Sequence, residues 1–135
     1  MFKYIKTIGA HSAAPEFEYL PVDPSSSITE GSMCEMVDGF LTNAYTTGKS
    51  KFLPVETKTE TDGKNFIKCI RILPGMLIEA SFLGDYSSIK AGTMTTITSS
   101  GIEAYNYCEE GNGQFEVVDT TNCSVTNKIT VTIHC

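Results

Sequence analysis

Several features are scarce or missing in this chain, and each absence narrows the functions open to it. Tryptophan is absent, and 135 residues include only two histidines. No stretch approaches the roughly 20 consecutive apolar residues that cross a bilayer as a helix, so we expect no membrane partner. Basic residues are few, 10 Lys and Arg against 16 Asp and Glu, which gives a net charge of −6. Because phosphate contacts by basic side chains supply most nucleic-acid affinity, this balance disfavours a nucleic acid partner.

Motifs for catalysis and metal binding are also missing. The cysteines are odd in number and form no C-x-x-C pair, which disfavours a zinc site or a disulfide framework and favours free thiols in a reducing cytoplasm. They are Cys34, Cys69, Cys108, Cys123 and Cys135. The sequence contains no G-x-S-x-G nucleophile elbow, and neither His11 nor His134 lies in a segment expected to be rigid. We therefore predict that the chain is not an enzyme and holds no metal or cofactor.

The segment 1–25 differs from the rest of the chain in its closely spaced prolines. Pro15, Pro21 and Pro24 lie close together there, which rules out a helix and disfavours a central strand. We predict an extended N-terminal arm over residues 1–25, followed by a β-barrel domain over 26–135. The apolar side chains of the arm could contact a partner or fold back onto their own domain, and both destinations stay open. The predicted interface residues are Phe2, Tyr4, Ile5, Phe17 and Tyr19.

From Ile28 onward, short apolar segments alternate with turn signals. Asp38-Gly39 between apolar segments is a strong hairpin signal, whereas the polar residues 56–64 indicate a solvated loop. No segment shows a 3.6-residue apolar period over ten or more residues. Strands are expected at 32–37, 40–44, 51–55, 65–72, 76–83, 89–98, 102–108, 115–119 and 128–134. Short strands at this spacing predict an all-β fold, and we favour a small barrel over a two-sheet sandwich.

Two stretches share the pattern S-S-I-x-x-G-[S/T]-M, one over residues 26–33 and the other over 87–94. The glycines should occupy turns that need a positive φ or a close backbone approach. Two copies are too few for a solenoid, so we interpret them as two strand-turn-strand modules of one barrel. The expected turn positions are Gly31, Gly39, Gly92 and Gly101.

The order of these motifs resembles the small capsid decoration, or head-stabilising, proteins of tailed bacteriophages. The resemblance rests on the I-x-x-G-S-M entry at 28–33, the V-D-G-F-L-T-N-A hairpin at 37–44 and the I-x-x-G-T-M entry at 89–94, and it covers about residues 22–108. It implies a compact barrel of the β-tulip type without catalytic residues. It further implies trimers made in the host cytoplasm that bind the outer surface of the virion head. There they would bridge subunits of the major capsid protein, and the arm would supply the capsid or neighbour-subunit contact.

A small β-barrel module that binds a sugar or another ligand is the alternative function. Tyr45, Tyr86, Tyr105 and Tyr107 could supply an aromatic platform, although packed strand tyrosines fit the same pattern. The two functions predict different behaviour of residues 1–25. In a capsid decoration protein these residues should become ordered on binding to capsids, whereas in a ligand-binding module they should already be folded in the free protein.

Overall fold

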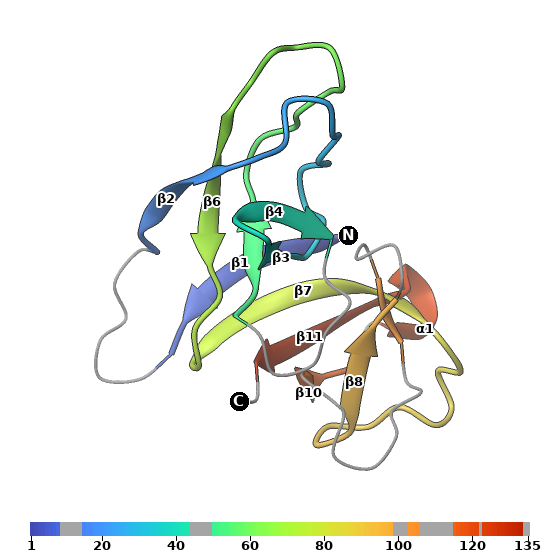
Figure 1. Cartoon of the computed structure of the whole chain (residues 1–135). Coiled ribbons are helices and arrows are strands. Elements are labelled where there is room, and N and C mark those ends of the chain that lie inside the picture. The colour runs from blue at the N-terminus through green and yellow to red at the C-terminus, as the bar shows by residue number, and fades with distance from the viewer. Residues whose placement is uncertain (9–14, 44–49, 99–102, 106–114, 122, 134–135) are drawn as a thin grey trace.

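The computed structural model describes residues 1–8, 15–43, 50–98, 103–105, 115–121 and 123–133, and Figure 1 draws the remaining residues in grey. The described chain is nearly all β, which confirms the predicted fold class. Its elements are β1 (Phe2–Thr7), β2 (Phe17–Pro21), β3 (Cys34–Val37), β4 (Phe40–Asn43), β5 (Phe52–Pro54), β6 (Phe66–Arg71), β7 (Met76–Leu83), β8 (Met94–Ile97), β9 (Ala104–Tyr105), β10 (Phe115–Asp119), α1 (Cys123–Thr126) and β11 (Lys128–Ile133).

A small closed barrel forms the lower half of the molecule in Figure 1. Its strand order is β7-β11-β10-β8-β9, and β9 returns to β7 through a short parallel pairing of Phe82 with Ala104 and Leu83 with Tyr105. β1 extends this sheet by pairing antiparallel with β7. Residues at every second position of β7, from Met76 to Phe82, are buried, as the alternating pattern in the sequence predicts.

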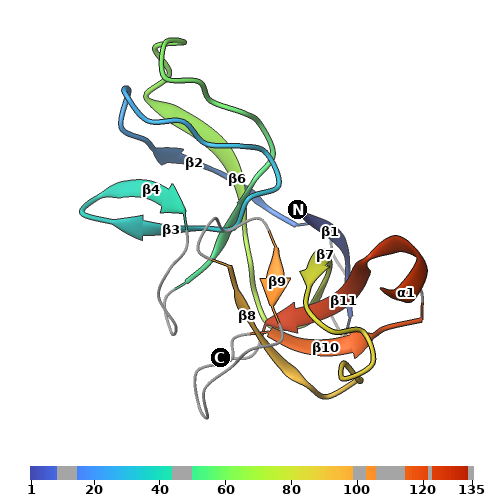
Figure 2. The same ribbon diagram turned by 90° about the vertical axis from the view of Figure 1, so that its right-hand side faces the viewer.

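The second sheet has the order β2-β6-β5-β3-β4 and lies above the barrel (Figure 1). It curls so that β4 comes near β2, and Figure 2 shows this curl from the side. The curl encloses a hydrophobic cluster of its own. The buried members of that cluster are Val22, Ile28, Cys34, Leu41, Phe52, Ile67 and Cys69.

The larger hydrophobic core joins the two sheets. Leu53 and Ile70 of the second sheet, together with Met33, belong to the same buried cluster as Phe2 and Ile78 of the barrel sheet. Because burial of large apolar side chains is the main favourable term in folding, this shared cluster makes the two sheets one folding unit.

The described parts of the segment 1–25, residues 1–8 and 15–25, contribute one strand to each sheet. β1 is paired within the barrel sheet and β2 within the second sheet. Phe2 is 3% exposed and stacks on Phe115, with ring centroids 5.8 Å apart. Of the two destinations left open for the apolar side chains of residues 1–25, Phe2 therefore takes the second and packs on its own domain. The physical reason is the apolar surface that Phe2 and its strand bury against β7.

The repeated motif is accompanied by the same local structure at both places. Just before each copy, an aspartate carboxylate accepts hydrogen bonds from the residue two positions on. Asp23 Oδ1 binds the main-chain N–H and the hydroxyl of Ser25 at 2.9 and 2.8 Å. Asp85 Oδ1 binds the same groups of Ser87 at 2.9 and 2.7 Å. An aspartate turn thus precedes both copies, but it is displaced by one residue, since Asp23 lies three positions before its copy and Asp85 lies two.

Each copy then enters a glycine turn. Gly31 has φ +83° and Gly92 has φ +91°, and Gly39 of the predicted hairpin also has φ +83°, so all three occupy the left-handed region that favours glycine. Gly101 lies outside the described residues. The isoleucine before each repeated turn is buried, Ile28 in the cluster of the second sheet and Ile89 in the shared core.

Two further aspartates make the same kind of turn. Asp62 accepts the main-chain N–H of Lys64 at 3.0 Å, and Asp119 accepts that of Thr121 at 2.9 Å. These hydrogen bonds stabilise the ionised carboxylate and therefore lower its pKa. The largest cause is a bond from a main-chain N–H at Asp23 and Asp62. At Asp85 and Asp119 it is a bond from a hydroxyl group. We call these four residues the turn aspartates: Asp23, Asp62, Asp85 and Asp119.

Candidate functional site

Three aromatic rings stand exposed on the outer side of the neighbouring strands β2 and β6. Phe17 and Tyr19 on β2 are 51% and 66% exposed, and Phe66 on β6 is 58% exposed. The register places Tyr19 opposite Lys68 and Pro21 opposite Phe66. Since directly opposed residues of antiparallel strands share a face of the sheet, these five side chains lie together. We call this surface the aromatic face.

The aromatic face is open because the barrel covers only part of the second sheet. Ile70 follows Lys68 by two positions on β6 and therefore lies on the same side of the strand, yet Ile70 belongs to the shared core, as does Leu53 opposite it. The barrel thus covers the Ile70 end of this side and leaves the Phe66 end uncovered. In Figure 1, β6 extends upward away from the barrel, and β2, which pairs with it, crosses it in this view.

Charged side chains flank the exposed rings. Lys68 Nζ lies 4.2 Å from the centroid of the Phe17 ring, within the range of a cation–π interaction. On the opposite side of the sheet, Arg71 and Glu18 form a two-pronged ion pair with N–O distances of 2.9 and 3.0 Å. The hydrogen bonds from Arg71 lower the pKa of Glu18. Both residues are partly exposed, so the pair contributes at most about 1 kcal/mol to stability.

The predicted interface residues divide into separate groups. Phe2 is buried, and Tyr4 is half-buried with its hydroxyl sharing a hydrogen bond of 2.7 Å with Thr7 Oγ1. Ile5 is 44% exposed at an irregularity in β1. Only Phe17 and Tyr19 come together on one surface.

The third ring of the aromatic face, Phe66, was not predicted as an interface residue from the sequence. Its meeting with Phe17 and Tyr19 depends on the pairing of β2 with β6, two strands that lie far apart in the sequence. A signal was nevertheless present, because Phe66 and Lys68 alternate with buried residues at the start of a predicted strand.

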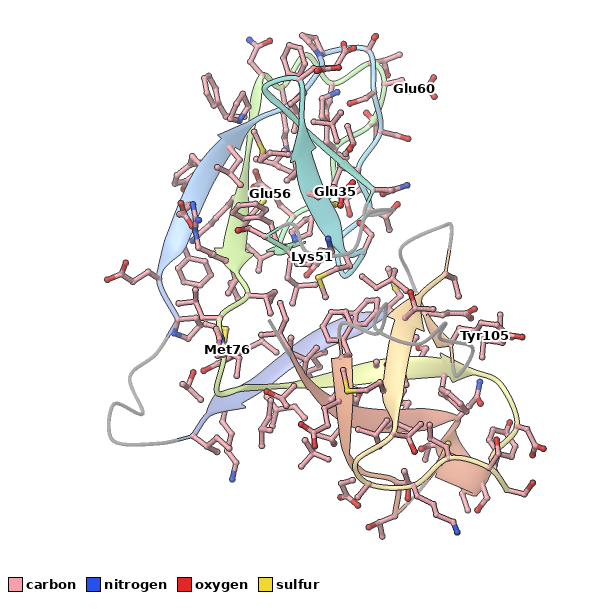
Figure 3. All side chains as sticks on the ribbon, turned by 60° about the horizontal axis from the view of Figure 1, so that its bottom comes forward. Glu35, Lys51, Glu56, Glu60, Met76 and Tyr105 are labelled. Atoms are coloured by element: carbon pink, nitrogen blue, oxygen red, sulfur yellow. The ribbon has the colours of Figure 1, made fainter. Side chains whose placement is uncertain are left out.

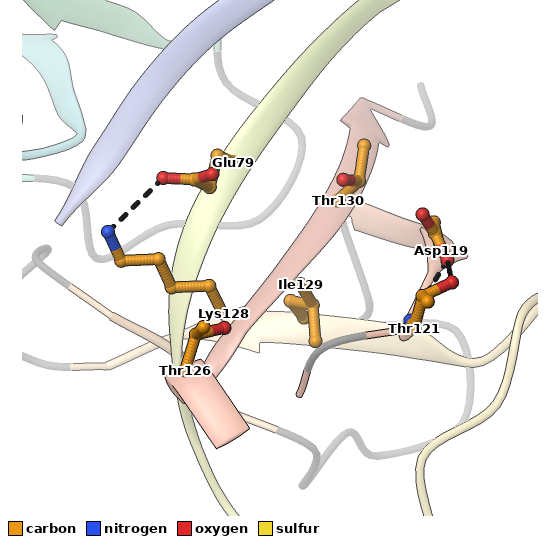
Figure 4. A pocket seen from close by; sticks show the side chains of 7 residues that line it. All are labelled: Glu79, Asp119, Thr121, Thr126, Lys128, Ile129 and Thr130. Atoms are coloured by element: carbon orange, nitrogen blue, oxygen red, sulfur yellow. Dashed lines mark hydrogen bonds and ion pairs between the residues drawn. The ribbon is translucent and has the colours of Figure 1, made fainter. Parts of the chain in front are cut away.

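A shallow polar cavity of about 260 Å³ lies over β7 and β11 (Figure 4). Lys128 Nζ lies 3.4 Å from Glu79 Oε1, and Asp119 is bound to the hydroxyl and the N–H of Thr121. The remaining residues that line the cavity are Thr126, Ile129 and Thr130. Its charged groups already have partners in the cavity wall, and neither histidine nor cysteine occurs among these described lining residues.

Two lysines are buried in the second sheet and its loops. Lys51 Nζ forms an ion pair of 3.0 Å with Glu35 Oε2, and both side chains are at most 1% exposed; Figure 3 shows the two residues beside each other. Lys58 lies in the segment 56–64 that the sequence analysis predicted to be solvated, but its side chain is fully buried. Its Nζ donates to the carbonyl oxygens of Pro24, Ser26 and Thr59 at 2.8, 2.7 and 2.9 Å.

The buried cysteines are poorly suited to nucleophilic chemistry. Burial raises the pKa of Cys34 to about 11 and that of Cys69 to about 12, and it also raises the pKa of Cys123. The reactive species is the thiolate, so these thiols are unreactive near neutral pH. Within the part of the chain that the structure describes, His, Cys, Asp and Glu side chains form no metal-binding group. The other two cysteines and both histidines lie outside that part.

The tyrosines of the alternative function are only partly described. Tyr86 is 45% exposed after β7, and Tyr105 is 38% exposed on β9, where Figure 3 shows it at the margin of the barrel. Tyr45 and Tyr107 lie outside the described residues, so the four-tyrosine platform stays a prediction.

No helix in the described part of the chain has the length and apolar character needed to cross a membrane. Comparisons of the chain with protein-family models, with curated proteins and with solved structures give no match.

Proposed function

We propose that this protein is a structural decoration protein that binds the outer surface of an assembled phage head and stabilises contacts between major capsid subunits. The observation that carries the proposal is the aromatic face on β2 and β6. Large contiguous apolar patches on a folded domain usually mark interaction sites, and buried aromatic anchors supply much of the affinity of protein interfaces.

Two features of the sequence support the same proposal. The paired I-x-x-G-[S/T]-M entries carry the resemblance to capsid decoration proteins. The net charge of −6 suits a protein on the outside of the head, away from packaged DNA. The resemblance also implies a trimer and a location on the virion surface, and both belong to the proposal.

Binding to capsids that lack this protein tests the proposal. The wild-type chain should reach near-stoichiometric occupancy in a co-sedimentation assay. Phe17→Ala, Tyr19→Ala and Phe66→Ala should each weaken binding about 30-fold, because truncation of an anchor ring costs about 2 kcal/mol. Substitutions are preferable to deletion of residues 1–21, because β1 and β2 belong to the two sheets.

Tyr86→Ala is the matched control, since this ring is exposed outside the aromatic face. Its occupancy should equal that of the wild type. If the wild-type chain does not bind capsids, the decoration function is wrong. If the three face variants bind as the wild type does, the role of the aromatic face is wrong.

A carbohydrate-binding module is the second candidate, and the same exposed rings favour it because apolar faces of sugars stack on aromatic side chains. A titration with sugars followed by NMR separates the candidates. Shifts of the Phe17, Tyr19 and Phe66 ring signals together with absent capsid binding would support the second candidate.

A further inference from the structure

The sequence contains two Asp-Gly dipeptides, and both lie in exposed turns of the second sheet. Asp38-Gly39 forms the tip of the hairpin between β3 and β4, which projects from the side of the molecule in Figure 2. Asp62-Gly63 lies in the loop between β5 and β6. An added Cβ at either glycine would meet no atom within 4 Å, so the two sites do not differ in the space around the glycine.

An aspartate before glycine can react with its own main chain. The main-chain nitrogen of the glycine attacks Cγ of the aspartate and gives up its proton, and one oxygen of the carboxyl group leaves as water. The product is a five-membered succinimide ring, and glycine permits its closure because it has no Cβ to obstruct the approach. The reaction needs no co-reactant.

Water then opens the ring at one of its two carbonyl carbons. Addition at Cγ restores the aspartate. Addition at the former main-chain carbonyl carbon leaves the glycine nitrogen bonded to Cγ, which is an isoaspartate linkage. Since one water leaves and one enters, aspartate and isoaspartate have the same atomic composition.

The carboxylate of Asp62 is held by its surroundings. Its Oδ2 accepts the N–H of Thr59 at 2.8 Å, and its Oδ1 accepts the N–H of Lys64 at 3.0 Å. The Nζ of the buried Lys58 lies 3.8 Å from the same Oδ1. These contacts stabilise the ionised carboxylate and fix its direction. Ring closure at Asp62 must break them, because the carboxyl group has to turn toward the glycine nitrogen and lose an oxygen.

Asp38 has no such tethers. Within the described part of the chain, neither its carboxylate nor the N–H of Gly39 takes part in a hydrogen bond or an ion pair. Asp38 also has φ +50°, a left-handed conformation that is uncommon for residues other than glycine. Among the described strands β4 is hydrogen-bonded to β3 alone, so the hairpin tip can open without breaking a second ladder.

We propose that Asp38 is a modification site at which the chain isomerises spontaneously to isoaspartate, whereas Asp62 is protected. The isoaspartate linkage adds one carbon to the main chain between residues 38 and 39. A two-residue turn with positive φ at both positions matches the twist of its strands, and the longer linkage does not. The pairing of Val37 with Phe40 should therefore loosen in the modified chain. The proposal does not depend on the proposed capsid binding.

Peptide mapping of the purified full chain after several weeks at mildly acidic pH tests the proposal. Fragmentation by electron transfer distinguishes isoaspartate from aspartate at each residue. Isoaspartate should accumulate at residue 38 about tenfold faster than at residue 62, a factor equivalent to about 1.4 kcal/mol, because only Asp62 must break two hydrogen bonds. In denaturing urea both sites lose their structure, and their rates should become similar.

Asp38→Asn provides a second measurement. Asn-Gly is favoured in the same turn, so the fold should persist. The variant closes the same succinimide with loss of ammonia, which appears as an increase in mass once water opens the ring, and this reaction should be faster than isomerisation of the wild type. An absence of isoaspartate at residue 38 of the folded wild type would overturn the proposal, as would a folded Asp38→Asn protein of constant mass. Equal accumulation at residues 38 and 62, or a tenfold difference that persists in urea, would refute the protection of Asp62 by its hydrogen bonds.

Discussion

Replacement of Lys58 by methionine should destabilise the protein strongly, although this lysine lies in a polar loop. Its Nζ joins the turn at Pro24 and Ser26 to the main chain of Thr59 through three hydrogen bonds of 2.7–2.9 Å. Truncation leaves three carbonyl oxygens without their charged donor, and each hydrogen bond to a charged group contributes about 1.5–3 kcal/mol. Removal of the buried ammonium also ends its desolvation cost. We therefore expect a net loss of about 3–5 kcal/mol in the free energy of unfolding.

Urea denaturation followed by circular dichroism measures this loss, and Lys64→Met provides the control. Lys64 lies in the same loop, but it is exposed and its Nζ is 3.4 Å from the carbonyl of Thr57, so its replacement should cost less than about 0.5 kcal/mol. Amide exchange should also accelerate in the Lys58 variant at Ile28, whose N–H donates to the carbonyl of residue 58. A loss below about 1 kcal/mol for Lys58→Met would refute the assigned role.

Three further predictions concern glycine turns, a buried ion pair and pH. Gly92→Ala should lower the free energy of unfolding, measured by urea denaturation, by about 1 kcal/mol, because alanine disfavours the positive φ at this position. Gly31→Ala should lower it more, because the added Cβ would also lie 3.2 Å from the carbonyl oxygen of Phe2. Equal losses would contradict this ranking. Glu35→Gln should lower the free energy of unfolding by about 3–5 kcal/mol, since it replaces the carboxylate that is paired with the buried Lys51 ammonium by a neutral amide, whereas a loss near zero would contradict the pairing. The turn aspartates have pKa values below their ordinary 3.8 in the folded protein. Their contribution to the free energy of unfolding is therefore fully present above pH 3.8 and is lost as the pH falls through the lowered pKa. The urea concentration at the unfolding midpoint should accordingly decrease when the pH is lowered below about 4, and this decrease should be smaller in Asp85→Asn. An identical dependence of the midpoint on pH in that variant would contradict the contribution of Asp85.

The all-β class and the repeated turns could be predicted because their signals are local. Alternation over 76–83 and 129–133 follows directly from the two-residue period of a strand. The glycines of the repeated motif mark turns that need a positive φ, and Gly31 and Gly92 adopt one. The short helical turn α1 was not predicted, because its four residues are too few to show a helical period.

The destination of the segment 1–25 and the composition of the aromatic face depend on distant partners. Prolines in 15–24 indicate an extended chain, but an extended chain can pair with its own domain as readily as with a partner. Lys58 illustrates the same limit: composition predicts a solvated lysine, whereas its burial depends on how residues 23–28 fold against it. Local sequence carries little information about contacts of this range.

The pairing of β1 with β7 has a consequence for synthesis of the protein. Phe2 lies opposite Ala80, so the ribosome must extend the chain from position 2 to position 80 before the first strand can find its partner. At roughly 5–20 residues per second this delay lasts about 4–16 seconds. During that time β1 exists as an unpaired amphipathic segment, and Lys3 and Lys6 help to keep it soluble. Charged side chains on a strand edge oppose pairing with other chains, and Lys3 and Lys6 place such charges on β1 from the start of synthesis.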